Sequence, residues 1–394
     1  MDAIARPTQP MPAFLTQGFR PFFLAAGIWS AAALALWIMV FVTGAALPSR
    51  FDPLTWHIHE MLFGFVMATI AGFLLTAIPN WTNRLPVSGA PLALLAGLWL
   101  LGRVACLGSA LVPPWIAMAA DLAFPVVLVG VVAREILAGR NWRNLPMVAP
   151  VALLGMANLL MHLEADGLGL PPGLGWRLGL AAVILLISVV AGRIVPSFTR
   201  NWLAKRPGTP RPAGHGWIDR AALATLHAGL IGWAFFPSFP PLGALLLLGA
   251  ALNLWRLLRW RGAATAAEPL LLILHIGYGW LVVGAGLLGA TLLDGDLPQS
   301  AAIHALTAGA IGTMTLAVMT RASRGHAGRE LTADRLTRLI YLLVTLAAIA
   351  RVTAAFAAAW TMPLLIASAC LWIAAFGGFV IGYAPMLLLP RDSR

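Results

Sequence analysis

Residues Thr55–Ile78 read TWHIHEMLFGFVMATIAGFLLTAI, and this run of sequence sets the class of protein. After Glu60 it contains no charged side chain, and about 20 apolar residues are enough to cross a bilayer as a helix. Two histidines, His57 and His59, nevertheless stand at its start. A polar ring in hydrocarbon is costly unless it has a partner, so these histidines indicate a functional site inside a membrane.

The composition extends this interpretation to the whole chain. Of its 394 residues, 60% are hydrophobic and 10% are charged, and the mean hydropathy is +0.86. The sequence therefore predicts an all-α integral membrane protein, a single polytopic domain over residues 1–394. Cys106 and Cys370 both fall within apolar runs, so no disulfide framework is expected. We expect twelve membrane-spanning helices, at Arg20–Gly44, Thr55–Ile78, Ala90–Ala110, Pro113–Leu137, Pro146–Glu164, Gly173–Val195, Trp217–Phe236, Pro240–Trp260, Pro269–Leu293, Gln299–Thr320, Arg335–Ala357 and Met362–Leu389.

Charged residues between these spans predict the orientation of the chain. The formal net charge is +12, but the basic residues are spread over many short loops, so no nucleic-acid-binding face is expected. Most of them lie before the first span, in the even-to-odd loops and after the last span, whereas the opposite loops carry acidic residues and only Arg50 and Arg177. By the positive-inside rule both termini are cytoplasmic. Residues 1–18 then form a cytoplasmic segment, and 196–216 form the longest cytoplasmic loop.

Similar short sequence motifs recur about four helices apart. Residues 77–84 (AIPNWTNR) end the second span, 194–202 (IVPSFTRNW) end the sixth, and 317–321 (AVMTR) end the tenth. Arg103 in the third span is echoed by Arg351 in the eleventh. This spacing indicates three pseudo-repeats of four helices, the architecture of haem–copper oxidase large subunits. Chance similarity among Leu- and Ala-rich helices is the alternative.

Six of the eight histidines fall within predicted spans. Four of them lie in the outer third of the membrane if each residue rises about 1.5 Å. These outer histidines are His57, His59, His162 and His304. We expect at least two of them to bind a metal or haem iron, because imidazole is the commonest metal ligand among side chains; a ring hydrogen-bonded to a nearby carbonyl is the alternative. His57 and His59 stand about 200° apart around a helix, so both cannot face one metal unless the helix begins after them.

Other polar residues in the spans are candidates for supporting roles. His227, as a metal ligand, and His275, beside a cofactor, lie deeper and could form a second site. Arg103 and Arg351 lie near the depth of the outer histidines, and a buried guanidinium needs an anionic partner. Haem propionates would supply two carboxylates suited to bidentate pairing; a salt bridge within the protein is the alternative.

Two carboxylates near the outer histidines are candidates for carrying protons. Glu60, beside His59, is the candidate catalytic residue. Asp52 could act in the same way, but it precedes Pro53 at an expected helix start, so capping that helix is its simpler role.

Several longer segments of the chain resemble sequence motifs of the NnrS family. They are residues 18–23 (GFRPFF), 56–65 (WHIHEMLFGF), 72–81 (GFLLTAIPNW), 304–316 (HALTAGAIGTMTL) and 319–326 (MTRASRGH). The likeness covers essentially the whole chain, although Ala327 stands where the family pattern has threonine. The resemblance implies a multi-pass protein of the bacterial inner membrane that contains haem and copper. It also implies an association with denitrification and with tolerance of nitric oxide (NO).

The resemblance leaves three functions open. A reductase would join two NO molecules into N2O with two electrons and two protons, at a haem–metal site near the periplasmic face formed by the outer histidines, with Glu60 delivering protons. A non-catalytic haem protein would bind or sense NO, or protect cellular iron. A twelve-helix transporter of a metal or an NO-derived complex would use the same histidines as a pathway. We expect b-type haem and copper as cofactors; the sequence indicates neither the electron donor nor the oligomeric state.

Overall fold

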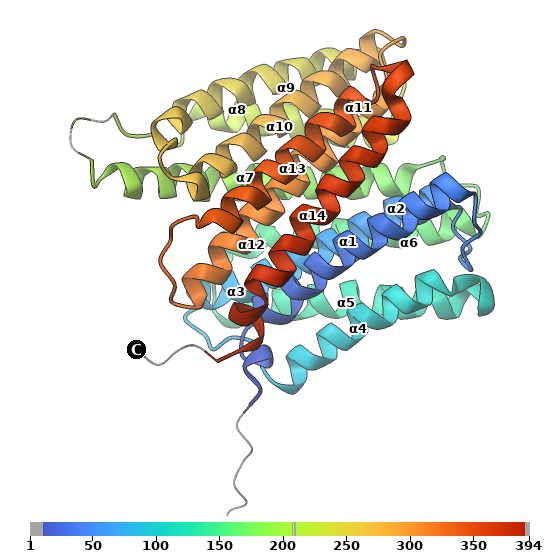
Figure 1. Ribbon diagram of the computed structural model, residues 1–394, viewed down its shortest axis with the longest axis horizontal. Helices are drawn as coiled ribbons and strands as arrows, with labels where there is room; N and C mark the ends of the chain where they lie inside the picture. Colours follow the sequence, from blue (N-terminus) through green and yellow to red (C-terminus); the bar gives the residue numbers. More distant parts are fainter. Residues whose placement is uncertain (1–10, 207, 209, 391–394) are drawn as a thin grey trace, which may run out of the picture.

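The computed structural model describes residues 11–390 except 207 and 209, and the secondary structure of this part is entirely helical (Figure 1). Its membrane-length helices match the twelve predicted spans one for one, so the predicted all-α membrane fold is confirmed. Their bounds are α1 Phe19–Thr43; α2 Pro53–His59, continuing through η2 Glu60–Val66 into α3 Met67–Thr82; α4 Ala90–Leu107; α5 Pro114–Ala138; α6 Val148–Ala165; α7 Leu174–Leu203; α8 Trp217–Phe235; α9 Pro240–Arg259; α10 Pro269–Leu293; α11 Gln299–His304, continuing through η6 Ala305–Ile311 into α12 Gly312–His326; α13 Arg335–Thr353; and α14 Thr361–Leu388.

Several helices are longer than the sequence predicted. The motifs expected at the ends of the sixth and tenth spans lie inside helices, which continue to Leu203 and His326, and the motif at 77–84 is helical as far as Thr82. The loop expected from residue 196 therefore begins only after Leu203. Pro196 does not end α7, because proline removes only one hydrogen-bond donor from a helix whose other turns are held by neighbouring helices. Of the predicted N-terminal segment 1–18, residues 1–10 lie outside the described part.

Eleven of the twelve helices are long and apolar enough to cross a membrane by length and composition. The exception is α8, whose hydropathy is lowered by Asp219, Arg220 and His227. Two of these polar residues lie in its first turn, where charge is tolerated best. We therefore keep α8 as the seventh span.

The packing of the helices follows the predicted grouping in fours. Within each group the third and fourth helices pack together (α4 with α5, α8 with α9, α13 with α14), and each fourth helix packs on the first helix of the next group, with α14 returning to α1. The second member of each group is the most enclosed. In Pro53–Thr82, Leu174–Leu203 and Gln299–His326, 78%, 61% and 72% of the most apolar 18-residue stretch is buried, against 56% or less in the other eight helices of this kind, α8 not included. This arrangement agrees with three pseudo-repeats closed into a ring around α3, α7 and α12.

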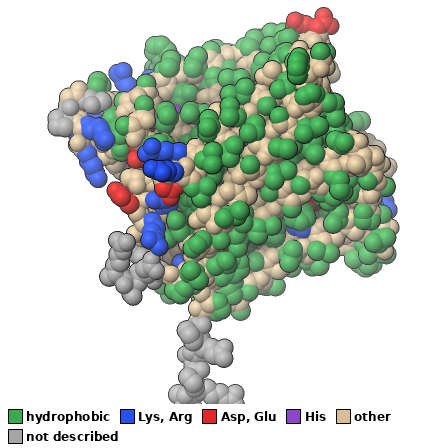
Figure 2. Space-filling view, in the orientation of Figure 1, with side chains coloured by type: hydrophobic (Ala, Val, Ile, Leu, Met, Phe, Trp, Pro, Cys, Tyr) green, Lys and Arg blue, Asp and Glu red, His purple; other side chains and the backbone are tan. Residues whose placement is uncertain are grey.

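Both ends of the described chain lie at the same end of the bundle (Figure 1). The 3₁₀ turn η1 (Ala13–Leu15) packs against α14, and Arg20 donates hydrogen bonds to the carbonyl oxygens of Leu387 and Leu389, at 3.4 and 2.6 Å. Figure 2 shows a group of basic side chains near this end, beside a broad hydrophobic surface. An even number of spans thus brings both chain ends to one face.

The second and tenth spans each contain a π-helical turn, η2 and η6. Each turn begins one residue after a histidine, His59 or His304, and each has a glycine five positions after that histidine, Gly64 or Gly309. A Cβ atom on Gly64 would lie 2.5 Å from Nε1 of Trp29, and Gly309 is crowded by a tryptophan ring in the same way. Glycine therefore allows an indole to pack against each turn. Such turns occur frequently at functional sites.

This packing predicts the effect of a methyl group on Gly64. Gly64→Ala should destabilise the protein by about 1–3 kcal/mol, because the added carbon overpacks the contact with Trp29. Gly97→Ala in α4 is the matched control, since no atom lies within 4 Å of a Cβ placed there. Thermal unfolding of the purified protein should show a lower midpoint for the first variant only. Equal midpoints would contradict the packing of η2 described above.

Candidate functional site

His57 and His59 point to different places, as their spacing in α2 predicts. His57 lines a cavity, whereas His59 is fully buried in a polar cluster on another side of the helix. The other two outer histidines divide in the same way: His304 lines the cavity with His57, and His162 lies beside His59, with ring centroids 5.4 Å apart. The expectation that the outer histidines meet at a single site is therefore wrong. They share a depth but form two sites.

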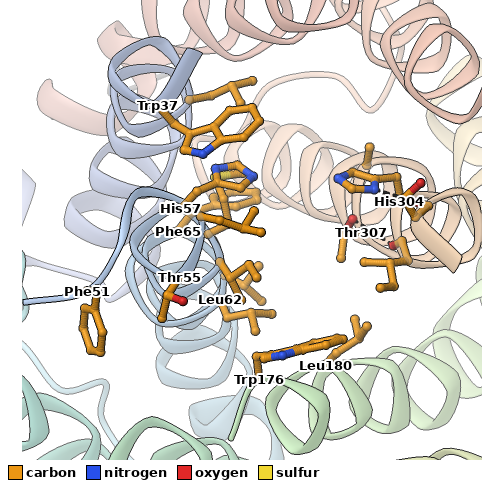
Figure 3. Close-up of a pocket in the computed structure, with 18 of the residues that line it drawn as sticks. Trp37, Phe51, Thr55, His57, Leu62, Phe65, Trp176, Leu180, His304 and Thr307 are labelled. Carbon is orange, nitrogen blue, oxygen red and sulfur yellow. Dashed lines mark hydrogen bonds between the residues drawn. The ribbon is translucent and has the colours of Figure 1, made fainter. Parts of the chain in front are cut away.

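The cavity has a volume of about 840 Å³, within the usual range for a ligand pocket. Its walls come from α1, α2, η2, α6, α7, α11, η6, α13 and α14, and apolar side chains such as Leu62, Phe65 and Leu180 form much of its lining. Figure 3 shows His57 and His304 on opposite sides of the space. The two imidazoles therefore face a shared, largely apolar volume.

Neighbouring groups fix both imidazoles. His57 stacks on Trp37, with ring centroids 4.3 Å apart, and its buried Nδ1 atom has no hydrogen-bond partner. His304 donates a hydrogen bond from Nδ1 to the carbonyl oxygen of Ser300, at 2.7 Å. In a neutral ring this bond leaves Nε2 of His304 as a free acceptor. Each histidine thus keeps one ring nitrogen without a partner in the protein.

Two arginines line the cavity, Arg50 and Arg351, and Arg50 already pairs with Asp166 at 2.9 Å, so Arg351 is the cation without a partner among the described residues. It lines the same space and makes no ion pair or hydrogen bond with any residue that the structure describes. Arg351 is partly buried, and a guanidinium inside a span without an anion is unusual in a membrane. Two imidazole donors, an apolar space of this size and a free guanidinium fit a haem whose propionate groups pair with Arg351.

Carboxylates at the rim of the cavity are held by the backbone. Asp52 caps α2 by accepting hydrogen bonds from the backbone N–H groups of Leu54 and Thr55, at 3.0 and 3.1 Å. Glu164 accepts one from Gly173, at 2.7 Å. The capping role of Asp52 is therefore the one that its contacts support.

The polar cluster lies between α2, α4, α5 and α6. The donor atoms of His59, Cys106, Asp121 and His162 all lie within 4.8 Å of one another, and all four residues are buried. The Nε2 atoms of His59 and His162 lie 3.1 and 3.0 Å from the same oxygen, Oδ2 of Asp121. Asn158 donates from Nδ2 to that oxygen at 2.8 Å, and its own Oδ1 faces Nε2 of His59 at 2.8 Å.

Arg103 belongs to this cluster and not to the cavity. It donates to Oε2 of Glu60 at 2.7 Å and to Oδ1 of Asp121. The guanidinium therefore already has two carboxylate partners, so the predicted contact with a haem propionate is corrected to a salt bridge within the protein. Glu60 also accepts hydrogen bonds from Trp29, at 2.7 Å, and from His59, at 3.1 Å. Glu60 does not line the cavity.

Asp121, Asn158 and Cys106 were given no role by the sequence reasoning. Asp121 and Asn158 lie within the fourth and fifth predicted spans. The rule that draws attention to histidines in a span applies equally to an acid or an amide there, so it could have found both. Nothing in its local sequence distinguishes Cys106, because its role depends on which helix packs beside it.

His227 and His275 join neither site. Nε2 of His227 lies 2.8 Å from the hydroxyl of Ser188, and Nε2 of His275 lies 3.0 Å from that of Thr199. Neither residue lines the cavity or contributes to the cluster. The two deeper histidines therefore have separate hydroxyl partners, and in the described part of the chain they belong to neither the cavity nor the cluster.

Comparison with known proteins identifies one family. A family model described as NnrS protein matches residues 13–391, which is nearly the whole chain. No curated protein matches the chain.

The salt bridges of Arg103 predict a large cost for its removal. Arg103→Met should destabilise the protein by about 3–5 kcal/mol, because Glu60 and Asp121 would keep buried charges without their partner. Arg84→Met is the control, since its bond to Glu135 is of similar length, at 2.8 Å, but the arginine side chain is 45% exposed and such a pair contributes about 0–1 kcal/mol. Thermal unfolding measures both. Equal losses would argue against a buried ionic cluster.

Proposed function

This chain belongs to the NnrS family, and on that premise we propose that it is a nitric-oxide-handling haem protein of the membrane, with the haem held between His57 and His304. The observation that carries the proposal is the pair of imidazoles facing each other across the cavity, each with a ring nitrogen that has no partner in the protein. Membership of the family supports the link to NO.

The residues around the cavity have distinct roles in this proposal. His57 and His304 would supply nitrogen ligands to the iron, and Arg351 would pair with the propionate groups. Trp37 holds the ring of His57 by stacking, and the Ser300 carbonyl fixes the ring of His304 with Nε2 towards a ligand. Bound haem would supply the iron, and because two histidine ligands leave it no open position, NO would bind in place of one of them. The apolar lining suits entry of NO, which is small and uncharged.

We propose a b-type haem, held without covalent bonds. Covalent attachment of haem uses a C-x-x-C-H motif, whereas the two cysteines of this sequence, Cys106 and Cys370, are far apart in the chain. We also propose copper as a second metal, bound away from the cavity histidines. The proposed location is the bacterial inner membrane, with both termini cytoplasmic; the basic loops and the shared position of the two chain ends support this orientation.

The catalytic form of the proposal is reduction of NO to N2O. Two NO molecules, two electrons and two protons would give N2O and one water, with the electrons coming from an external donor. Non-catalytic binding of NO by the haem is the second candidate, and the position of Glu60 favours it. Glu60 is held by Arg103, Trp29 and His59 outside the cavity, so it is poorly placed to deliver protons there.

Transport is the least supported of the three functions. Midplane substrate sites in transporters are typically built from helices that are interrupted by unwound backbone. The two histidine-bearing spans, Pro53–Thr82 and Gln299–His326, pass continuously through their π turns.

The haem proposal predicts which side chains retain the cofactor. His57→Ala and His304→Ala should each lower the haem bound per chain severalfold, because each removes an iron ligand, and Arg351→Met should weaken retention by removing the propionate partner. His227→Ala, which changes a histidine outside the cavity, should leave haem content unchanged. The Soret absorbance of purified protein, compared with its protein concentration, measures this. Unchanged occupancy in all three cavity variants would refute the placement.

Exposure to NO separates the catalytic from the non-catalytic candidate. Both predict a shift of the Soret band when NO is added to the wild-type protein. Only the reductase consumes NO and releases N2O when a chemical reductant supplies electrons, as an NO electrode and gas chromatography would record. A colourless preparation whose spectrum is unaffected by NO would leave neither candidate standing.

A further inference from the structure

We propose that His59, Cys106, Asp121 and His162 form a buried, four-ligand metal site for a copper or zinc ion, separate from the cavity. The proposal concerns these residues and their geometry, and it rests on the proposed function only for the expectation of copper. The four side chains come from α2, α4, α5 and α6, and their exposed fractions are 0%, 0%, 1% and 6%. Four helices thus bring two nitrogens, a sulfur and an oxygen within 4.8 Å of one another.

The arrangement of acceptors around His59 calls for a cation. Nδ1 of His59 faces Oε1 of Glu60, at 3.1 Å, and Nε2 faces oxygens of Asn158 and Asp121, at 2.8 and 3.1 Å. A neutral imidazole carries a single N–H group, so one of its nitrogens would meet oxygen atoms with no proton between them. A second proton on the ring would resolve this conflict, and so would a metal ion at Nε2. Only the metal also uses the donor atoms of His162 and Cys106, which lie within 4.8 Å. Nε2 of His162, 3.0 Å from the same Asp121 oxygen, is directed at the same point.

The outer contacts of His59 have the form that metal-ligating histidines take. Such a histidine usually donates its second ring N–H to a carboxylate, which fixes the ring. Nδ1 of His59 donates to Glu60 in this way, and Glu60 is in turn held by Arg103 and Trp29. Glu60 is therefore a positioning residue for His59 and not a proton donor to the cavity.

The charges of the cluster leave room for one more positive charge. Glu60 and Asp121 carry two negative charges and Arg103 carries one positive charge, so the buried group is left with a single excess negative charge. Buried charges need compensation. Zinc(II) or copper(II) bound to a Cys106 thiolate, whose proton is released on binding, restores neutrality, whereas copper(I) bound to the thiolate leaves one negative charge.

The donor set selects the class of ion. Imidazole and sulfur ligands favour copper and zinc, whereas magnesium and calcium prefer oxygen. Four protein ligands in a closed site are typical of a metal that has no open position for substrate. The site is therefore expected to hold its ion without binding NO, in contrast to the cavity that His57 faces.

Metal content of the purified full-length protein tests the inference. Wild-type protein with its haem, loaded with Cu(I) under reducing conditions or with Zn²⁺, should bind a single ion per chain at this site, measured by mass spectrometry of the metals. Cys106→Ser and His162→Gln should lose that ion while keeping their haem. Cys370→Ser, an exposed cysteine, and His227→Gln are the controls and should retain it. Comparing the amounts of Cu(I) and Zn²⁺ that are retained shows whether the site prefers copper or zinc.

A second measurement covers variants that fold poorly. Wild-type protein loaded with Co²⁺ should absorb in the near ultraviolet through a thiolate–cobalt charge-transfer band, and added NO should not change that band. Wild-type protein that binds neither metal, or a Cys106→Ser variant that binds as much as wild type, would overturn the site and leave a polar core with a protonated His59. Loss of haem with the metal retained would instead contradict only the proposed function.

Discussion

A charge in hydrocarbon must find its partner inside the protein, and this constraint organises the first four helices around Arg103. Its pairing with Glu60 and Asp121 ties α4 to η2 and to α5. Gly102 makes the approach of α5 feasible, because a Cβ atom there would lie 2.7 Å from Oδ1 of Asp121. Apolar side chains cannot supply this specificity, since lipid tails receive them as readily as another helix does.

The other two groups of helices also contain charged residues inside the bundle, and each neutralises them with an arginine–aspartate pair of its own. Asp219 of α8 accepts a hydrogen bond from Arg256 of α9 at 3.0 Å, and Arg256 also donates to the hydroxyl of Tyr278 at 2.8 Å. Arg324 of α12 pairs with Asp334, just before α13, at 2.8 Å. Each pseudo-repeat thus contains an arginine–aspartate pair between neighbouring helices. Arg351 departs from this pattern, because no carboxylate in the described part of the chain pairs with it.

The sequence was sufficient for the spans and insufficient for the sites, for physical reasons. Bilayer thickness sets the length of an apolar run, so twelve runs gave twelve helices. Counting residues along a helix gives depth, but the direction in which a side chain points depends on packing, which is why His59 and His304 share a depth without sharing a site. The spacing of His57 and His59 did predict their divergence, because that angle is local to one helix. Asp121 and Cys106 lie on different helices, and only the fold brings them together.

Helix α2 lies between the cavity and the cluster. Its rotation about its own axis determines which histidine faces which site. A one-residue slip turns a helix by about 100°, which would take His57 off Trp37 and His59 away from Asp121 at the same time. The contacts on the two sides therefore hold the same register: stacking on Trp37 from one side, and the oxygen of Asp121 from the other. The π turn that follows adds a third restraint, because the Gly64 carbonyl accepts a hydrogen bond from Trp99 at 2.9 Å. Residues 57–59 can serve two sites of different chemistry because three contacts hold this short segment: Trp37 on one face, Asp121 on the other, and the π turn that follows.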